Sequence, residues 1–316
     1  VLICAGRAPY SFLGEFPGGR DLSIHWIQEQ RDQAGIVRPF TKWDYEIHRP
    51  EMTGFIVHRA IQVASAQPSG PVYLVLPRES LMEPLSEILL PDPSRHALPT
   101  TPTGDLHAIR AIANDLSQAE YPLIIVGDSG RNSTSISALI ELAETIGARV
   151  ATGPTRMGFP SNHPLWVGMT AEAHLPNADA VLIIDADVPW IPSKTNLRPS
   201  SKVFRIDIDP VKESMPLWSF PSDVVLHADS AKAIPLLTQE VKTYLSVNHT
   251  ASISSRTATI KADTIERLNA LEREDLSLQD HNPIATQWLL RCLAQTLPSE
   301  ALVLEETVTS RYRLHE

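Results

Sequence analysis

Short apolar runs alternate with amphipathic segments through the middle of the chain. A short apolar run with turn residues on both sides is typical of a strand buried on both faces of a sheet, and apolar residues at i, i+3 and i+4 are typical of a helix. The predicted strands are 123–126, 149–152, 180–185, 203–207 and 224–226, and the predicted helices are 105–118, 133–146 and 230–245. This alternation predicts an α/β fold with a doubly wound, Rossmann-like parallel sheet.

The N-terminal part shows the same pattern less regularly. Residues 1–6 and 72–76 predict two further buried parallel strands, and helices are expected near 24–35 and 53–66. Ser23 is a candidate N-cap for the first of these helices, because a Ser side chain can accept from a free backbone N–H. This part therefore belongs to the same fold class.

A proline-rich segment, 89–104, separates this part from the middle of the chain and is the best linker candidate. Beyond the middle, the Ser- and Thr-rich residues 246–262 indicate a surface connection. Charged helices are then predicted near 260–275 and 283–296, and a buried strand at 301–304. A chain that starts in a strand without Met, and stops soon after another strand, is expected to be a fragment of something longer.

The composition narrows the functional classes. At about 100–200 residues per domain, 316 residues suggest about two domains. The formal net charge of −10 is unfavourable for binding a phosphate backbone, so we expect no nucleic-acid partner. No apolar run approaches the roughly 18 residues of a membrane span. The two cysteines, Cys4 and Cys292, cannot form a disulfide framework. A reducing compartment is therefore expected, which favours the cytoplasm and leaves the mitochondrion open.

Proline is unusually frequent, with 26 Pro against 14 Gly, which reverses the usual order. The prolines are spread along the chain and predict many stiff connections between regular elements.

One candidate anion site follows the predicted strand 123–126. The loop 127–131 carries Gly127, Gly130 and Arg131 and precedes a predicted helix. Backbone N–H groups at such a place can hold a diphosphate, although an ordinary Gly turn would give the same pattern.

Four acidic residues mark the ends of two neighbouring predicted strands. Asp185 and Asp187 follow one strand, and Asp207 and Asp209 follow the next. Ligands of open α/β sheets bind at carboxyl strand ends, where a carboxylate can accept from a ribose. Capping or turn formation explains the same residues and is the slightly favoured interpretation.

Other motifs are sparse. Gln28 and Glu29 could face a site or lie on a solvated helix face. His163 lies in Asn-His-Pro, where packing in a loop is the simpler interpretation. The histidines and cysteines show no metal-binding spacing, and no nucleophile elbow or phosphate-binding P-loop occurs. The chain by itself shows no assembled catalytic set.

Several segments nevertheless run in the order of a known family. In the first part these are 6–9, 27–29, 38–42 and the Gly-Pro-Val-Tyr-Leu-Val-Leu-Pro-Arg-Glu run at 70–79. They resemble the pyrimidine-binding domain of thiamine-diphosphate-dependent enzymes, closest to the acetolactate synthase large subunit and benzoylformate-decarboxylase-like proteins. The central part is similar to that family's central domain at 121–130, 162–164 with Gly168, 185–190 and 206–210. Residues 301–306 resemble the first strand of its diphosphate-binding domain.

The resemblance implies an order of domains. Residues 1–88 would be the C-terminal part of the pyrimidine-binding domain, 89–104 a linker, and 105–246 a Rossmann-like (DHS-like) central domain. Residues 247–299 would be a linker with helices, and 300–316 the start of the diphosphate-binding domain. The intact family acts as a homodimer or homotetramer on a small-molecule 2-oxo acid, and decarboxylates it or joins it to a second carbonyl.

Thiamine diphosphate and Mg²⁺ are the cofactors that the resemblance implies. The family's catalytic Glu is expected upstream of Val1, and its Gly-Asp-Gly…Asn motif downstream of the last residue. The resemblance therefore predicts that this chain alone is inactive. The alternative is a non-catalytic module that binds FAD or NAD.

A few functional residues carry over from the family. Gln28 and Glu29 match the segment that borders the active site, where Ile27 replaces an aromatic residue, and Lys42 matches a lysine near the substrate entrance. In flavin-binding members, FAD is held by the Gly loop, a Gly-Met-His-Gly loop and the acidic strand ends. Gly168 and Met169 keep that second loop only in part, which leaves FAD open.

Overall fold

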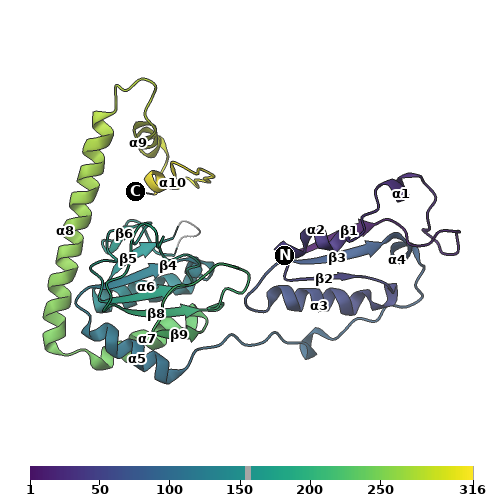
Figure 1. Cartoon of the computed structure of the whole chain (residues 1–316), viewed down its shortest axis with the longest axis horizontal. Coiled ribbons are helices and arrows are strands. Elements are labelled where there is room, and N and C mark those ends of the chain that lie inside the picture. The colour runs from purple at the N-terminus through teal and green to yellow at the C-terminus, as the bar shows by residue number, and fades with distance from the viewer. Residues whose placement is uncertain (154–157, 316) are drawn as a thin grey trace. The chain divides into compact units, whose positions relative to one another are not determined.

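The computed structural model describes residues 1–153 and 158–315 and divides the chain into two compact units, Val1–Thr101 and Pro102–Glu316 (Figure 1). Each unit contains one parallel sheet. The α/β fold with parallel sheets that the sequence predicts is therefore confirmed.

The second unit is built on a six-stranded sheet in the order β6-β5-β4-β7-β8-β9. Its strands are β4 (Pro122–Val126), β5 (Arg149–Thr152), β6 (Trp166–Gly168), β7 (Ala180–Ile184), β8 (Lys202–Asp207) and β9 (Val224–His227). Counted from β4, this is the Rossmann order 3-2-1-4-5-6, in which the chain reverses its direction of travel between β4 and β7. That reversal is the place where ligands of such sheets usually bind.

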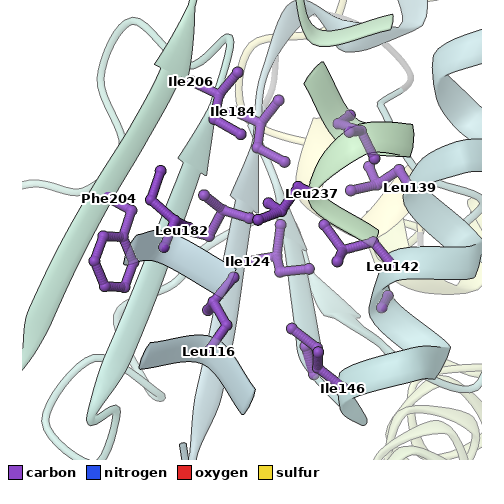
Figure 2. Packing of buried hydrophobic residues seen from close by; sticks show 14 of the residues in the cluster. Leu116, Ile124, Leu139, Leu142, Ile146, Leu182, Ile184, Phe204, Ile206 and Leu237 are labelled. Carbon is purple, nitrogen blue, oxygen red and sulfur yellow. The ribbon is translucent and has the colours of Figure 1, made fainter. Parts of the chain in front are cut away.

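One face of this sheet is covered by helices, and we call it the helix face. Ile124, Leu182 and Phe204 point to it, and their exposed fractions are 0%. Figure 2 shows these side chains packed against Leu116, Leu142 and Leu237 from three helices. These helices are α5 (Leu106–Gln118), α6 (Ser133–Ile146) and α7 (Ser230–Tyr244). Their predicted boundaries agree with the structure, because each has an apolar stripe and a side-chain cap.

The opposite face is covered by turns, and we call it the loop face. Strand side chains alternate in direction, so Ile125, Val181 and Val203 point to this face. They pack against Leu175 in the turns 171–178 and against Trp190. Between β4 and β5 the short 3₁₀ turn η4 (Asp128–Arg131) leads into α6. Within the described chain, regular helices thus cover one face and turns cover the other.

The predicted surface connection at 246–262 is wrong. These residues begin α8 (Val247–Ser277), a helix of 31 residues. The side chains of Ser246 and His249 form a capping box, and Arg256 donates to the carbonyls of Gly147 at 2.9 Å and Ala119 at 3.1 Å. Ile260 is fully buried against the helix face. These tertiary contacts override the weak helix propensity of Ser and Thr.

The predicted strand at 301–304 is also wrong. Two short helices, α9 (Thr286–Thr296) and α10 (Arg311–Leu314), flank this segment, which joins neither sheet among the described residues. Leu302 and Leu304 are 86% and 88% exposed. An apolar run forms a strand only where a neighbouring strand pairs with its backbone.

None of the helices in the described chain is long and apolar enough to cross a membrane.

The first unit has a three-stranded sheet in the order β1-β3-β2. Its elements are β1 (Leu2–Arg7), α1 (Ile24–Ile27), α2 (Gln33–Val37), η1 (Arg38–Phe40), β2 (Trp43–Glu46), η2 (Pro50–Met52), α3 (Thr53–Ser65), β3 (Val72–Pro77), α4 (Arg78–Met82) and η3 (Pro93–Arg95). The central strand β3 is buried as predicted. The sequence predicts a buried strand at residues 1–6, but among the described residues β1 pairs with β3 alone, and Ile3 is 42% exposed.

The single helix predicted at 24–35 is replaced by the short helices α1 and α2. Ser23 makes no side-chain cap, whereas Asp32 caps α2 by accepting from the N–H of Gly35. The prediction omitted β2 and β6, because neither has the long apolar run on which it depended.

Candidate functional site

A cavity of about 380 Å³ opens at the carboxyl ends of β4, β5 and β7, where the strand order reverses. Its walls are mostly apolar and come from the loop face. Five segments line it: the strand ends 125–127 and 151–153, the turn 169–172, the loop 186–191 and Met215, together with Tyr312. The position is the one that the strand order predicts for a ligand.

Gly127 brings two strand ends together beside this cavity. An added Cβ atom would lie 2.2 Å from the carbonyl oxygen of Asp185, so the backbones could not approach with any other residue at this position. The N–H of Gly127 donates to Ile184 at 2.9 Å, and that of Asp128 donates to the Asp185 carbonyl at 2.8 Å. The loop after β4 is thus fastened to the end of β7.

The carboxylate of Asp185 is the internal partner of this loop. It accepts from the Ser129 hydroxyl at 3.0 Å and from the Arg131 guanidinium at 3.1 Å. It also accepts from the hydroxyl of Ser230, the first residue of α7. Asp185 is 4% exposed and has a φ of 48°, a conformation that Asp adopts more easily than most residues. In the loop expected to bind a diphosphate, Arg131 is therefore engaged by a buried carboxylate, and the N–H groups of Gly127 and Asp128 are engaged by backbone carbonyls.

Asp207 and Asp187 share one cation. The ammonium of Lys212 lies 2.9 Å from Asp207 Oδ2 and 2.8 Å from Asp187 Oδ1. Asp207 also accepts from the N–H of Asp209 at 2.8 Å, so Asp209 contributes its backbone while its own carboxylate is half-buried. Lys212 has a φ of 55°, a strained conformation for a lysine, and is 7% exposed. The loop after β8 thus places the buried ammonium of Lys212 between the carboxylates of Asp187 and Asp207.

Burial and ion pairing shift the pKa values of the groups in this cluster in opposite directions. Burial raises the pKa of Asp207 above its ordinary value, although the Asp209 N–H and Lys212 act in the other direction. Burial by itself would lower the pKa of Lys212, but the bonds to Asp187 and Asp207 raise it overall. Burial lowers the pKa of Arg205, whose guanidinium lies 4.6 Å from the centre of the Trp218 ring. The pairing keeps Lys212 protonated across the physiological range.

The predicted second half of the site lies in the turn after β6. Gly168 ends β6 with a φ of 117°, and Met169 lines the cavity. Gly130 lies half-buried in the turn η4. The cavity also receives Glu172 and Trp190, which sequence reasoning did not select. Glu172 forms no motif with its neighbours, and Trp190 stands only at the end of the matched segment 185–190, so neither was selected as a site residue.

Glu172 is the residue of the cavity whose charge has no described partner. Its Oε2 atom is buried and has no hydrogen-bond partner among the described residues. None of the described lining residues is a lysine or arginine, and the other lining carboxylate, Asp187, is paired with Lys212. A buried carboxylate oxygen without a donor is costly, typically by about 1–3 kcal/mol or more. The cavity is thus lined by one carboxylate, that of Glu172, that has no hydrogen-bond donor or cation beside it among the described residues.

The first unit contains the remaining predicted site residues. Gln28 and Glu29 are exposed, and Glu29 forms an ion pair with Arg20 at 2.5 Å. The Lys42 ammonium donates to the carbonyls of Val63 at 2.9 Å and Ala66 at 2.6 Å. These carbonyls end α3, so Lys42 acts as a C-terminal cap in this structure. Partial burial lowers the pKa of Lys42.

The structure places no described residues of a metal centre together. Among residues 1–153 and 158–315, no group of three or more His, Cys, Asp or Glu side chains could hold a metal ion. The clustered acids at the strand ends are instead neutralised by Arg131 and Lys212. The acidic strand ends therefore stabilise the loops of the described chain.

Comparison with known sequences identifies the central part. Residues 109–235 match the family described as "Thiamine pyrophosphate enzyme, central domain". The central part of the chain is thus similar to the central domain of thiamine-diphosphate-dependent enzymes. This family relation is the one that the segments in the sequence indicate, and the matched residues include the six-stranded sheet up to the first turns of α7.

Individual relatives agree with this assignment. The chain is 28% identical to the oxalyl-CoA decarboxylase of Escherichia coli over 208 residues, which cover 61% of this chain and 36% of that protein. It is 27% identical to a probable acetolactate synthase large subunit of Methanocaldococcus jannaschii over 199 residues, or 58% of this chain and 33% of that protein. The chain thus spans about a third of the length of these curated relatives.

Solved structures support the fold. The benzoylformate decarboxylase of Polynucleobacter necessarius superposes with a TM-score of 0.61 at 24% identity, covering 78% of this chain and 44% of that one. A putative thiamin diphosphate-dependent enzyme from Mycobacterium smegmatis gives the same TM-score of 0.61 over 76% of this chain and 45% of that one. At this level of identity the likeness establishes the fold.

Proposed function

We propose that this chain supplies the central domain, with part of a pyrimidine-binding domain, to a thiamine-diphosphate-dependent 2-oxo-acid decarboxylase or carboligase that resembles acetolactate synthase. The match of residues 109–235 to the central domain of thiamine pyrophosphate enzymes carries this proposal. The relatives named acetolactate synthase and oxalyl-CoA decarboxylase support the reaction class. The substrate would be a small 2-oxo acid.

The reaction chemistry would come from the cofactor. Thiamine diphosphate, when bound, would supply the electron sink that 2-oxo-acid chemistry needs. Mg²⁺ would accompany the diphosphate and prefers oxygen ligands. The described residues do not fit this cofactor pair, because they contain no cluster of metal ligands and the sequence contains no Gly-Asp-Gly. We therefore assign no catalytic step to a residue of this chain.

This mismatch leads to a proposal about the isolated chain: it binds no thiamine diphosphate productively and turns over no 2-oxo acid. The intact enzyme would be a homodimer or homotetramer. The cytoplasm is the favoured compartment, and the mitochondrion remains a second candidate.

The test is an assay of the purified chain for release of CO₂ from pyruvate, benzoylformate and oxalyl-CoA, with Mg²⁺ and thiamine diphosphate in excess. We expect no release above the background without protein, whereas a full-length relative assayed in parallel should be active. Release that depends on the chain and on thiamine diphosphate would contradict the proposed inactivity. Size-exclusion chromatography with light scattering would determine whether the chain alone self-associates.

A second candidate function is a non-catalytic module that binds FAD or NAD. The cavity at the reversal of strand order favours it, because dinucleotides bind there in Rossmann folds. The described residues fit a dinucleotide poorly. The cavity has a volume of about 380 Å³ and a carboxylate, Glu172, without a described cation beside it. Co-purification of a flavin absorbance, or calorimetric binding of NAD, would support this candidate, and a colourless chain that binds neither would remove it.

A further inference from the structure

The cavity on the loop face has the size and walls of a site for one small ring system. Its volume of about 380 Å³ lies near the lower end of the range of ligand pockets, roughly 300–1,000 Å³. Trp190 is 5% exposed and is held against the Phe220 ring with centroids 5.1 Å apart. Ile125, Ala151 and Met169 supply further apolar surface. A flat apolar group would replace water at these walls.

The charge of the cavity determines what such a ligand should carry. Glu172 lines the cavity, and its Oε2 atom is buried without a described donor. The neighbouring carboxylate of Asp187 already pairs with Lys212 at 2.8 Å. A ligand that brings an N–H donor, and above all a cationic one, would pair with the carboxylate of Glu172, whereas an anion would add a second negative charge.

The position of Glu172 is fixed by its neighbours in the turn. Ala171 is 2% exposed and belongs to the core of the loop face, and Leu175 is fully buried. The carbonyl of Glu172 accepts from the Thr195 hydroxyl at 3.3 Å. A carboxylate held by a packed turn loses little freedom when a ligand binds, and this preorganisation favours affinity.

We propose that this cavity binds a small aromatic compound that carries a protonated amine, with the ring against the apolar walls and the ammonium donating to the carboxylate of Glu172. This inference concerns the cavity only and does not depend on the thiamine-diphosphate chemistry. Its ligand is a different class from an anionic dinucleotide.

The experiment titrates the chain with three compounds of similar size: 2-phenylethylamine, 2-phenylethanol and 3-phenylpropionate. Ligand-observed NMR at millimolar concentration gives the dissociation constants. Because a hydrogen bond to a charged group contributes more than a neutral one, the amine should bind about tenfold more tightly than the alcohol. The carboxylate should bind most weakly. Equal or tighter binding of 3-phenylpropionate, or no binding of the amine, would overturn the proposal.

Variants then assign the effect to one side chain. Glu172→Gln keeps the size of the side chain and removes its charge, so it should weaken the amine about tenfold and leave the alcohol unchanged. The matched control is Glu120→Gln, an exposed carboxylate at the amino end of β4, which should change neither. Unchanged affinity of the amine for Glu172→Gln would overturn the proposal. If that variant does not fold, the comparison of the three compounds on the original chain remains the decisive result. None of these measurements involves CO₂ release, so the outcome is independent of the proposed enzyme function.

Discussion

The two faces of the six-stranded sheet differ in how closely they are packed and in the charges that they bury. The helix face is apolar and fully packed, with Ile124, Leu182 and Phe204 at 0% exposure under three capped helices. The loop face carries a cavity, a buried cation at Lys212 and an unsatisfied carboxylate at Glu172. Buried charges and empty volume both cost stability. We infer that the helix face holds the fold, and that its stability allows the loop face to keep a binding cavity.

The largest effect should come from the helix face. Phe204→Ala removes a fully buried ring and should lower the free energy of unfolding by about 3–5 kcal/mol. The matched control is Leu217→Ala, since Leu217 is 98% exposed in the loop after β8 and should change stability by less than about 0.5 kcal/mol. Denaturant unfolding followed by circular dichroism measures both. Equal losses would show that the division between the faces is wrong.

The next effect should come from the edge where the two faces meet. Asp185→Asn keeps the side-chain shape and tolerates the positive φ, but it removes the charge that holds Arg131. We expect a loss of about 1.5–3 kcal/mol, the usual contribution of a hydrogen bond to a charged group. Asp209→Asn is the control, because only the backbone of Asp209 is bonded in the described structure and its half-buried side chain is not. A similar loss for both variants would mean that Asp185 has no special role.

A further effect, negligible at neutral pH and growing only in acid, should appear as a pH dependence of the loop face. Burial, with help from Arg149, lowers the pKa of His174 to about 4, and its Nδ1 lies 3.0 Å from the Tyr121 hydroxyl. Arg267 adds to this lowering, and Asp263 opposes it. Because the unfolded chain takes up the proton near pH 6.5, stability should be constant above that pH and fall as the pH drops toward 4.

The slope of this fall should be at most about 1.4 kcal/mol per pH unit for one proton. His174→Gln should remove this slope and leave the rest of the profile unchanged. Denaturant unfolding between pH 4 and pH 7 measures the difference between the two proteins. An unchanged slope in the variant would assign the pH dependence to other groups.

The sequence predicted the central sheet well because its strands are buried on both faces. The runs 123–126 and 180–185 consist of Leu, Ile, Val and Ala with few polar residues, and that pattern is typical of a parallel strand. It failed where tertiary contacts decide the conformation. Arg256 and Ile260 hold 246–262 in a helix that Ser and Thr do not predict. The apolar run 301–304 lacks a partner strand, so its composition alone could not make it a strand.

For the candidate site, the sequence predicted the acidic residues at the strand ends but not the ion pairs that they form. It selected Asp185, Asp207 and the loop 127–131, and the structure shows Asp185 and Asp207 already paired with Arg131 and Lys212. Pairing between residues far apart in the chain has no local pattern. Glu172 was missed for a related reason, because an unsatisfied carboxylate is defined by what surrounds it in space. Assignments of this kind require coordinates.

We infer that Glu172 serves ligand binding and does not stabilise the loop face. The most direct test is the thermal unfolding midpoint of Glu172→Gln with and without 2-phenylethylamine. A ligand that binds only the folded state raises the midpoint. We predict that the variant without ligand unfolds at the midpoint of the original chain or above it, and that it loses most of the rise with the amine. A lower midpoint without ligand, together with an unchanged rise, would contradict the account.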